Sequence, residues 1–481
     1  MKSRRLNILK DLHEVMSTMK REIALVKNTI IIGFGTMLPK VAGLVTLPII
    51  TGCLTKGEMG TYDIITTIIS LFLPVITLQI QTAAFRFLLE CETQNERKEI
   101  ISTMLIFGAG ISIAAVVTFY FVLYRFQFIT RLLICLYFLV DILLIMFQQI
   151  ARGLQQNKLY SASAIIVSFF NMILVLMTVQ VIQEGLNGVF FSISIATIAA
   201  AIYVSVRLKL FSYFDYKQFS LIRLKEMLSY SWPMIPNSLS NWVMNLSDRV
   251  VITASLGLEA NAIYSVANKI PNLFTSVQGT FVMAWQENAS IASKDDDIAV
   301  YYTKMFESVF NILFGIMACL ISFSPILFNI LVRGDYSDAY LQMPILYIGL
   351  LFSAIASFIG GIYVACKKTK SIGFTTIVAA VINLLVSISL VKLIGIYAGS
   401  VSTLVSFMVL AVFRMINIRK YVKVDYNIVR ISAQIFILIA LSILCYQQKL
   451  IFDIICIILA FFSAVFFNLD VIRLFIKKIK P

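Results

Sequence analysis

Charged side chains inside long apolar segments are the residues of this sequence most able to do chemistry. Four of them are cations, namely Lys40, Arg86, Arg249 and Lys269. An ion is expensive to hold in lipid, so such residues usually face a hydrated cavity or an oppositely charged partner. The acids in comparable positions are fewer, namely Asp63, Asp248 and Glu287. This excess of positive charge favours an anionic ligand, because arginine binds phosphate through paired hydrogen bonds and lysine binds it as a point charge.

Amide side chains recur at helical spacing in two neighbouring segments. The first stripe covers an arc of about 80° and consists of Asn237, Asn241, Asn245 and Asp248. The second covers an arc of about 100° and consists of Asn261, Ser265, Asn268, Lys269, Asn272, Ser276 and Glu287. Amides suit sugar hydroxyls, so the stripes indicate a water-filled cavity for a hydroxyl-rich substrate. The alternative is a dry bundle in which these groups hydrogen-bond between helices.

These patterns predict a substrate-binding cavity and a gate. We expect the cavity to be lined by Lys40, Arg86, Asn237, Asn241, Asp248, Arg249, Asn268, Lys269 and Asn272. Asp248 and Arg249 have an alternative role in a salt bridge, either with each other or between the two halves of the protein. We expect Arg86 and Glu287 to pair at the cytoplasmic end when that side is closed.

Composition identifies the elements that must position these residues. Of 481 residues, 59% are hydrophobic and 14% are charged, and the mean hydropathy is +0.90, which excludes a water-soluble, fibrous or disordered protein. Continuous apolar runs suit helices, whereas barrel strands would alternate polar and apolar residues. We therefore predict an all-α polytopic membrane protein with about fourteen transmembrane helices. They lie at 29–50, 61–90, 99–124, 131–151, 158–183, 188–208, 227–255, 260–291, 299–332, 340–366, 371–394, 396–416, 428–447 and 450–468.

Positive charge is concentrated on one side of these predicted spans. Most of the 40 Lys and Arg residues lie in the terminal segments and even-numbered loops. The odd-numbered loops hold six, namely Lys56, Arg125, Arg131, Arg333, Lys392 and Lys449. The positive-inside rule therefore predicts that both termini are cytoplasmic, and it accounts for the net charge of +15 without nucleic acid. Residues 1–28 form a basic arm that we expect to lie on anionic lipids of the inner leaflet.

The sequence also contains an internal repeat. The basic turn QQNK at residues 155–158 is followed by Asn171 and Gly185, and the turn KKTK at residues 367–370 is followed by Asn383 and Gly395. Pro39 and Tyr62 correspond in the same way to Pro236 and Tyr264. We predict two pseudo-symmetric six-helix lobes, 29–208 and 227–416, in the same orientation around a central cavity. A cytoplasmic linker at 209–226 is either an interfacial helix or a plain connection, and residues 417–481 add two helices and a basic cytoplasmic tail.

Signals for catalysis, metals and nucleotides are missing from the sequence. The one histidine, His13, precedes the first span, so a zinc site or a histidine relay is not expected. The sequence lacks a GxxxxGK[ST] phosphate-binding loop, a nucleophile elbow and a loop with paired acids. We therefore expect no catalytic residue and no cofactor. Energy would come from an H+ or Na+ gradient, from the membrane potential or from the substrate's own gradient.

The segment from Gly33 to Phe87 resembles the opening of bacterial polysaccharide flippases. The matching elements are the pairs Leu38–Pro39 and Leu47–Pro48, the residues Leu54, Gly60, Tyr62 and Asp63 of one turn, and the run from Ala84 to Arg86. These flippases, which include O-antigen flippase-like proteins, belong to the multidrug/oligosaccharidyl-lipid/polysaccharide exporter superfamily. The repeated basic turns and the number of spans also fit this group.

The resemblance implies a function in the bacterial cytoplasmic membrane. Such proteins move a polyprenyl-diphosphate-linked oligosaccharide to the outer leaflet by rocking two lobes around a cationic cavity, and a polysaccharide polymerase complex is a potential partner. The implied roles place the diphosphate or acidic sugars on the four cations, and the glycan on Asn237, Asn241, Asn268 and Asn272. The first alternative is an ion-coupled multidrug exporter of the same superfamily, in which Asp63, Asp248 or Glu287 would be the coupling carboxylate. The others are a membrane enzyme, such as a polymerase or glycosyltransferase, and a scaffold without transport.

Overall fold

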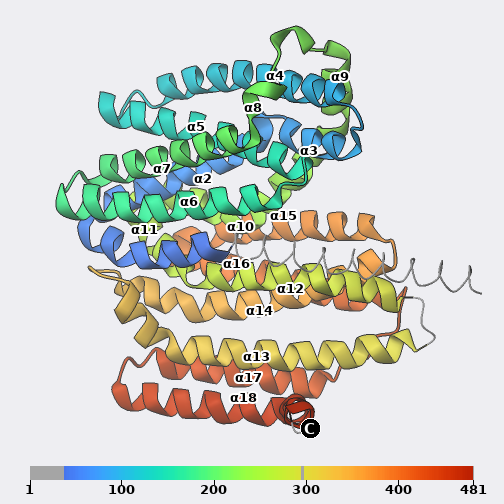
Figure 1. The fold of residues 1–481 in the computed structure, drawn as a ribbon. Helices are drawn as coiled ribbons and strands as arrows, with labels where there is room; N and C mark the ends of the chain where they lie inside the picture. The colour runs from blue at the N-terminus through green and yellow to red at the C-terminus, as the bar shows by residue number, and fades with distance from the viewer. Residues whose placement is uncertain (1–36, 294–296, 480–481) are drawn as a thin grey trace, which may run out of the picture. The chain divides into compact units, whose positions relative to one another are not determined.

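The computed structural model describes residues 37–293 and 297–479, and every regular element in these ranges is a helix (Figure 1). Within them, eleven helices are long and apolar enough to cross a membrane, and each matches a predicted span. These helices are α2 (Lys56–Ile76), α4 (Gln94–Val122), α5 (Phe128–Gly153), α6 (Asn157–Val175) with its extension η1 (Leu176–Val181), α7 (Gly185–Leu208), α13 (Ile298–Leu331), α14 (Ser337–Ala365), α15 (Thr369–Ile394), α16 (Tyr397–Ile418), α17 (Ile428–Cys445) and α18 (Leu450–Ile479). The prediction of an all-α polytopic membrane protein is confirmed. The basic arm at residues 1–28 lies outside the described residues.

The other three predicted spans are shorter or more polar helices. The first is the apolar helix Met37–Cys53. The second is α10 (Met234–Leu256), and the third is divided into α11 (Leu258–Lys269) and α12 (Pro271–Ala292). Helices α10, α11 and α12 carry the two polar stripes, which lower their hydropathy. That these three segments cross the membrane stays a prediction.

Continuous helices are predicted in two places where the structure has breaks. The span 61–90 is divided between α2 and α3 (Ile80–Glu90) by Leu78 and Gln79, whose φ angles are 47° and 57°. The span 260–291 is divided at Pro271, which begins α12 because proline lacks the N–H that a helix interior needs.

The linker at 209–226 forms no single interfacial helix. It contains the short helices α8 (Leu210–Tyr213) and η2 (Tyr216–Gln218) and the start of α9 (Leu221–Ser231). Hydrogen bonds to α4 hold this stretch, since the Asp215 N–H donates to the Ser102 hydroxyl at 2.9 Å and the Ser220 N–H to the Thr103 hydroxyl at 3.1 Å. The alternative of a plain connection therefore describes it better.

The described chain forms two compact units. Unit 1 contains the segments up to residue 43, 76–175 and 189–232, and unit 2 contains 44–75, 176–188 and the chain from residue 233 onward. Unit 1 therefore holds α3 to α6, most of α7, and α8 to α9. Unit 2 holds α2, η1 and α10 to α18. The lobe boundaries at 29–208 and 227–416 stay a prediction.

Helix α14 forms the core of unit 2. Of its most apolar stretch, 83% is buried, and glycines allow its neighbours to approach. A side chain at Gly361 would overlap the Trp285 ring, which stacks on Phe358 with centroids 4.2 Å apart. Helices α13, α17 and α18 lie side by side in the same unit (Figure 1).

The two basic turns of the predicted repeat have the same backbone conformation. Gln155 and Lys367 have φ angles of 59° and 58°. In each turn the following N–H donates to a carbonyl five residues earlier, from Gln156 to Ala151 and from Lys368 to Tyr363, both at 2.8 Å. This agreement supports duplication, because non-glycine residues rarely adopt left-handed backbone angles.

Candidate functional site

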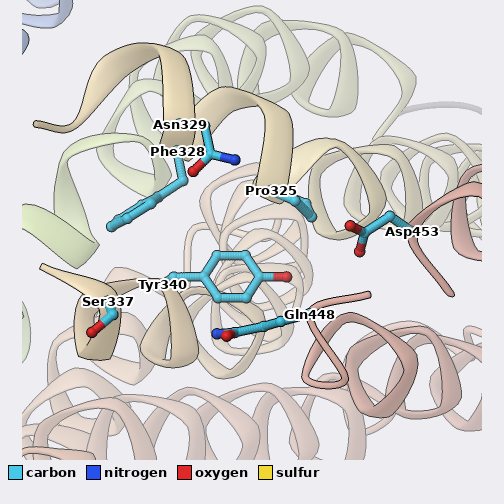
Figure 2. A pocket seen from close by; sticks show the side chains of 7 residues that line it. All are labelled: Pro325, Phe328, Asn329, Ser337, Tyr340, Gln448 and Asp453. Carbon is cyan, nitrogen blue, oxygen red and sulfur yellow. The ribbon is translucent and has the colours of Figure 1, made fainter. Parts of the chain in front are cut away.

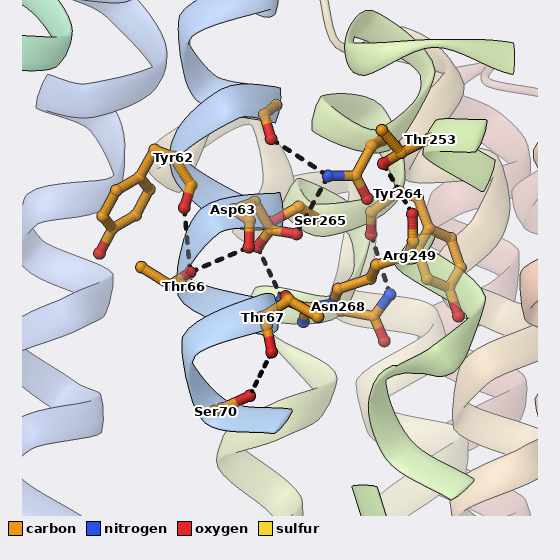
Figure 3. Close-up of polar contacts among 12 residues, drawn as sticks. Tyr62, Asp63, Thr66, Thr67, Ser70, Arg249, Thr253, Tyr264, Ser265 and Asn268 are labelled. Carbon is orange, nitrogen blue, oxygen red and sulfur yellow. Dashed lines mark hydrogen bonds and ion pairs between the residues drawn. The ribbon is translucent and has the colours of Figure 1, made fainter. Parts of the chain in front are cut away.

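A buried ion pair joins α2 and α10 within unit 2. The Arg249 guanidinium lies 2.6 Å from the Asp63 carboxylate, and their side chains are 10% and 2% exposed. The carboxylate also accepts hydrogen bonds from the Ser265 hydroxyl and, at 3.3 Å, from the Asn261 amide, both on α11 (Figure 3). Such complete pairing is what a buried charge requires. Arg249 thus bonds to Asp63, and not to its neighbour Asp248.

A close approach of backbones brings α2 to this position. A Cβ added at Gly60 would lie 1.9 Å from the Leu258 carbonyl oxygen, so only glycine fits there. Two turns along α2, the Trp242 indole N–H donates to the Thr67 carbonyl at 3.2 Å and to the Ser70 hydroxyl at 3.0 Å. Helix α2 is therefore fixed to α10 and α11 by sterics and hydrogen bonds as well as by charge.

Asp248 is a buried carboxylate whose hydrogen-bond donors are all neutral. It is 2% exposed and accepts hydrogen bonds from the hydroxyls of Tyr264 at 3.2 Å, Ser402 at 2.9 Å and Thr403 at 2.8 Å. Among the residues that the structure describes, no cation forms an ion pair with it. The site thus holds a negative charge through dipoles alone.

Lys269 adds positive charge beside the ion pair. It is half-buried at the end of α11 and interacts electrostatically with both Asp63 and Arg249. Its ammonium forms no hydrogen bond or ion pair with any described residue. Two cations, Arg249 and Lys269, therefore lie beside the single carboxylate of Asp63, while Asp248 is held by neutral donors.

The predicted amides differ in their surroundings. Asn237 and Asn241 are exposed, and Asn268 and Asn272 are half-buried. The Asn268 side chain donates to the Tyr264 carbonyl of its own helix at 2.9 Å. Asn241 faces a polar cavity of about 310 Å³ inside unit 2.

The remaining predicted site residues are Lys40, Arg86 and Glu287. Lys40 and Arg86 belong to unit 1. Arg86 forms an ion pair with Glu90 of its own helix at 2.5 Å, and both side chains are half-exposed or more. Glu287, on α12 of unit 2, is exposed and has no ion pair with a described residue. The gate between Arg86 and Glu287 stays a prediction.

Arg414 on α16 is a buried cation that the sequence interpretation missed. It is 5% exposed and lines the same cavity as Asn241. A signal for it exists in the sequence, since Ser402, Ser406 and Arg414 are spaced by multiples of four and so share one face of a helix. Arg414 lies close to the predicted end of its span, where arginines usually reach the lipid headgroups.

A second cavity, of about 250 Å³, lies at the ends of α13, α14 and α18 (Figure 2). Asp453 points into it opposite the Tyr340 hydroxyl (Figure 2), and that hydroxyl donates to the Cys445 carbonyl at 2.9 Å. In the part of the chain that the structure describes, no cluster of His, Cys, Asp or Glu could hold a metal ion.

The fold and these sites define a multi-pass helical membrane protein with buried charges and a polar cavity among its helices. The chain belongs to the polysaccharide biosynthesis protein family, which matches residues 25–286, more than half of its length. The resemblance found in the sequence is thereby confirmed. No curated protein matches the sequence significantly.

Solved structures of transporters share the fold. Lipid II flippase MurJ in an inward closed conformation has a TM-score of 0.71 at 14% identity, over 92% of this chain and 100% of that chain. An inward-facing multidrug resistance MATE family transporter of the MOP superfamily has a TM-score of 0.62 at 14% identity, over 82% and 98%. A MOP superfamily transporter from Pyrococcus furiosus has a TM-score of 0.59 at 15% identity, over 85% and 96%. At these identities the likeness shows the fold alone.

Proposed function

We propose that this protein is a flippase for polyprenyl-diphosphate-linked oligosaccharides in the bacterial cytoplasmic membrane. It would move them from the inner to the outer leaflet by alternating access, for synthesis of a surface polysaccharide such as O-antigen or capsule. The family supports a role in polysaccharide biosynthesis, and the fold is shared with a lipid II flippase. The observation that carries the proposal is the pairing of two neighbouring cations, Arg249 and Lys269, with the one carboxylate of Asp63, because two adjacent cations suit a diphosphate.

The ion pair suggests how the substrate is received. A phosphate oxygen can replace Asp63 as the partner of Arg249, while the displaced carboxylate keeps its hydrogen bonds from Ser265 and Asn261 and its attraction to Lys269. Lys269 lies beside the pair and would bind the second phosphate as a point charge. Lys40 and Arg86 would attract the substrate, the exposed amides Asn237 and Asn241 would contact the glycan, and the polyprenyl chain would stay in lipid. The termini would be cytoplasmic, near anionic lipids, and a polymerase complex would receive the product.

Asp248 supports a proposal for the coupling step. A buried carboxylate held only by neutral groups can be neutralised by a proton or a sodium ion. In an Asp248→Asn variant we expect transport to lose its dependence on the pH or sodium gradient. Unchanged dependence would exclude Asp248 from coupling.

A multidrug exporter is the second candidate, because MATE transporters share the fold and Asp248 resembles a coupling carboxylate. The two candidates differ in what accumulates when the gene is depleted. A flippase leaves lipid-linked oligosaccharide on the cytoplasmic leaflet. A drug exporter leaves surface polysaccharide unchanged and raises drug sensitivity.

Depletion with complementation is therefore the decisive experiment. The wild-type gene should remove the lipid-linked oligosaccharide that accumulates on the cytoplasmic leaflet. The Lys269→Ala gene should remove it at a rate at least about tenfold lower, which corresponds to about 1.4 kcal/mol of lost binding free energy. Lys269→Arg keeps the charge and should complement. Lys449→Ala, at an exposed turn before α18, is the matched control and should also complement. Glycan lipid that is exposed outside but unpolymerised after depletion would instead favour an enzyme or a scaffold.

A further inference from the structure

The polar cavity within unit 2 has the features of a ligand site. It lies among α10, α12, α14, α15 and α16, and its volume is about 310 Å³. Its polar lining consists of Asn241, Asn245, Gln286, Ser353, Ser357, Thr376 and Arg414. No carboxylate of the described chain lines it. The volume is sufficient for a small ligand, since ligand sites begin at about 300 Å³, and the amides and hydroxyls of the lining can hydrogen-bond to sugar hydroxyls.

Arg414 gives this cavity a fixed positive charge. Its guanidinium donates to the hydroxyls of Thr375 and Thr376, both at 3.0 Å, and to the carbonyls of Ala356 at 2.8 Å and Ile372 at 3.3 Å. All four acceptors are neutral, so the hydrogen bonds orient the group without cancelling its charge. A guanidinium has five N–H donors, and one remains for a ligand.

A purely structural role for Arg414 accounts for these contacts less well. Its hydrogen bonds connect α16 to α14 and α15, and neutral amide side chains could make such connections without burying a charge. A buried cation without an acid carries a desolvation penalty that hydrogen bonds to neutral groups offset only in part. An anion bound in the cavity would supply the counter-charge and so offset the rest of this desolvation penalty.

We propose that this cavity binds one acidic sugar unit of the transported glycan, with its carboxylate toward Arg414 and its hydroxyls on the amides and hydroxyls of the lining. The inference rests on the proposed function and specifies its substrate class as an acidic glycan. It places the sugar within unit 2, in a cavity that is lined by neither Arg249 nor Lys269, the residues that would hold the diphosphate.

Cysteine labelling in the full-length protein tests the charge of the cavity. Ser353→Cys, in a background with the seven native cysteines replaced by serine, places a thiol in the lining. An anionic thiosulfonate reagent should label it about tenfold faster than a cationic one of the same size, because a fixed charge at about 10 Å changes the local ion concentration by that factor. Asn329→Cys is the matched control, since it lines the second cavity beside Asp453 (Figure 2) and should favour the cationic reagent.

Arg414 variants and free sugars complete the test. Arg414→Gln should abolish the preference at Ser353→Cys, and Arg414→Lys should restore it. If Arg414→Gln does not fold, protection by sugars in the otherwise unchanged Ser353→Cys protein is the deciding measurement. Glucuronate should slow labelling while glucose does not. Three results would each overturn the proposal. They are equal protection by both sugars, protection by inorganic diphosphate alone, and equal labelling rates with the anionic and cationic reagents.

These results separate the cavity from the proposed function. Selective protection by glucuronate in a protein that does not flip lipid-linked glycan would refute the flippase and leave the sugar site standing. Flipping without any protection or charge preference would refute the sugar site alone.

Discussion

The ion pair between Asp63 and Arg249 is the most tightly constrained contact at the scale of single residues. Replacing Asp63 by asparagine leaves the guanidinium buried without a counter-ion, which costs about 3–5 kcal/mol in comparable buried pairs. We expect Asp63→Asn to lower the melting temperature of the purified protein by several degrees. Thermal unfolding in detergent, followed by tryptophan fluorescence, measures this change.

The double variant tests whether the charge is the cause. Asp63→Asn with Arg249→Gln removes both charges and keeps groups that can hydrogen-bond, so it should recover part of the lost stability. If the double variant is as unstable as the sum of the two single variants, the residues do not interact as the structure describes.

Helical spacing could predict which side chains are polar and buried, but not which of them meet. Asp63 and Arg249 are 186 positions apart, and periodicity orders residues only along one helix. For Arg249, the alternative of a salt bridge between the two predicted halves of the chain is therefore confirmed, but helical spacing could not identify Asp63 as its partner. Ser265 and Asn261 were predicted as part of a stripe, and their bonds to Asp63 required the close approach at Gly60.

Two glycines of one helix provide a prediction at the scale of elements. Gly60 on α2 faces the Leu258 carbonyl, whereas a Cβ at Gly57, less than one turn earlier, would meet no atom within 4 Å. Gly60→Ala should force α2 away from α11, with a loss of about 1–3 kcal/mol in stability. Gly57→Ala should be neutral or slightly stabilising, because alanine favours a helix. Melting temperatures of the two variants compare them directly, and equal temperatures would contradict the close packing.

The repeated turns provide a second prediction at this scale. Lys367 has a left-handed backbone with a φ of 58°, which costs a non-glycine residue about 1 kcal/mol. Lys367→Gly should therefore raise the melting temperature. Lys370→Gly, inside the first turns of α15, is the matched control and should lower it, because glycine weakens a helix. An increase in both variants would show that charge, and not backbone angle, is responsible.

At the scale of elements, the sequence predicts the long apolar helices but not every break between helices. The positions of the eleven apolar helices followed from hydropathy, because long apolar runs have few alternatives in a membrane. The break after α2 did not follow from hydropathy, since Leu78 and Gln79 adopt left-handed angles although neither is a glycine. The polar helices α10 to α12 were found through their stripes, although their hydropathy is lower than that of the other spans.

Charge distribution over the whole molecule predicts the orientation of the protein in the membrane. The proposed function requires that the substrate is received at the inner face, so the orientation can be tested against it. The positive-inside rule places the turn between α16 and α17 inside the cell and the turn between α17 and α18 outside. In intact spheroplasts, a membrane-impermeant maleimide should label Lys449→Cys and leave Lys420→Cys unlabelled until the cells are permeabilised. Labelling of Lys420→Cys alone would reverse the orientation, and with it the leaflet from which the protein takes its substrate.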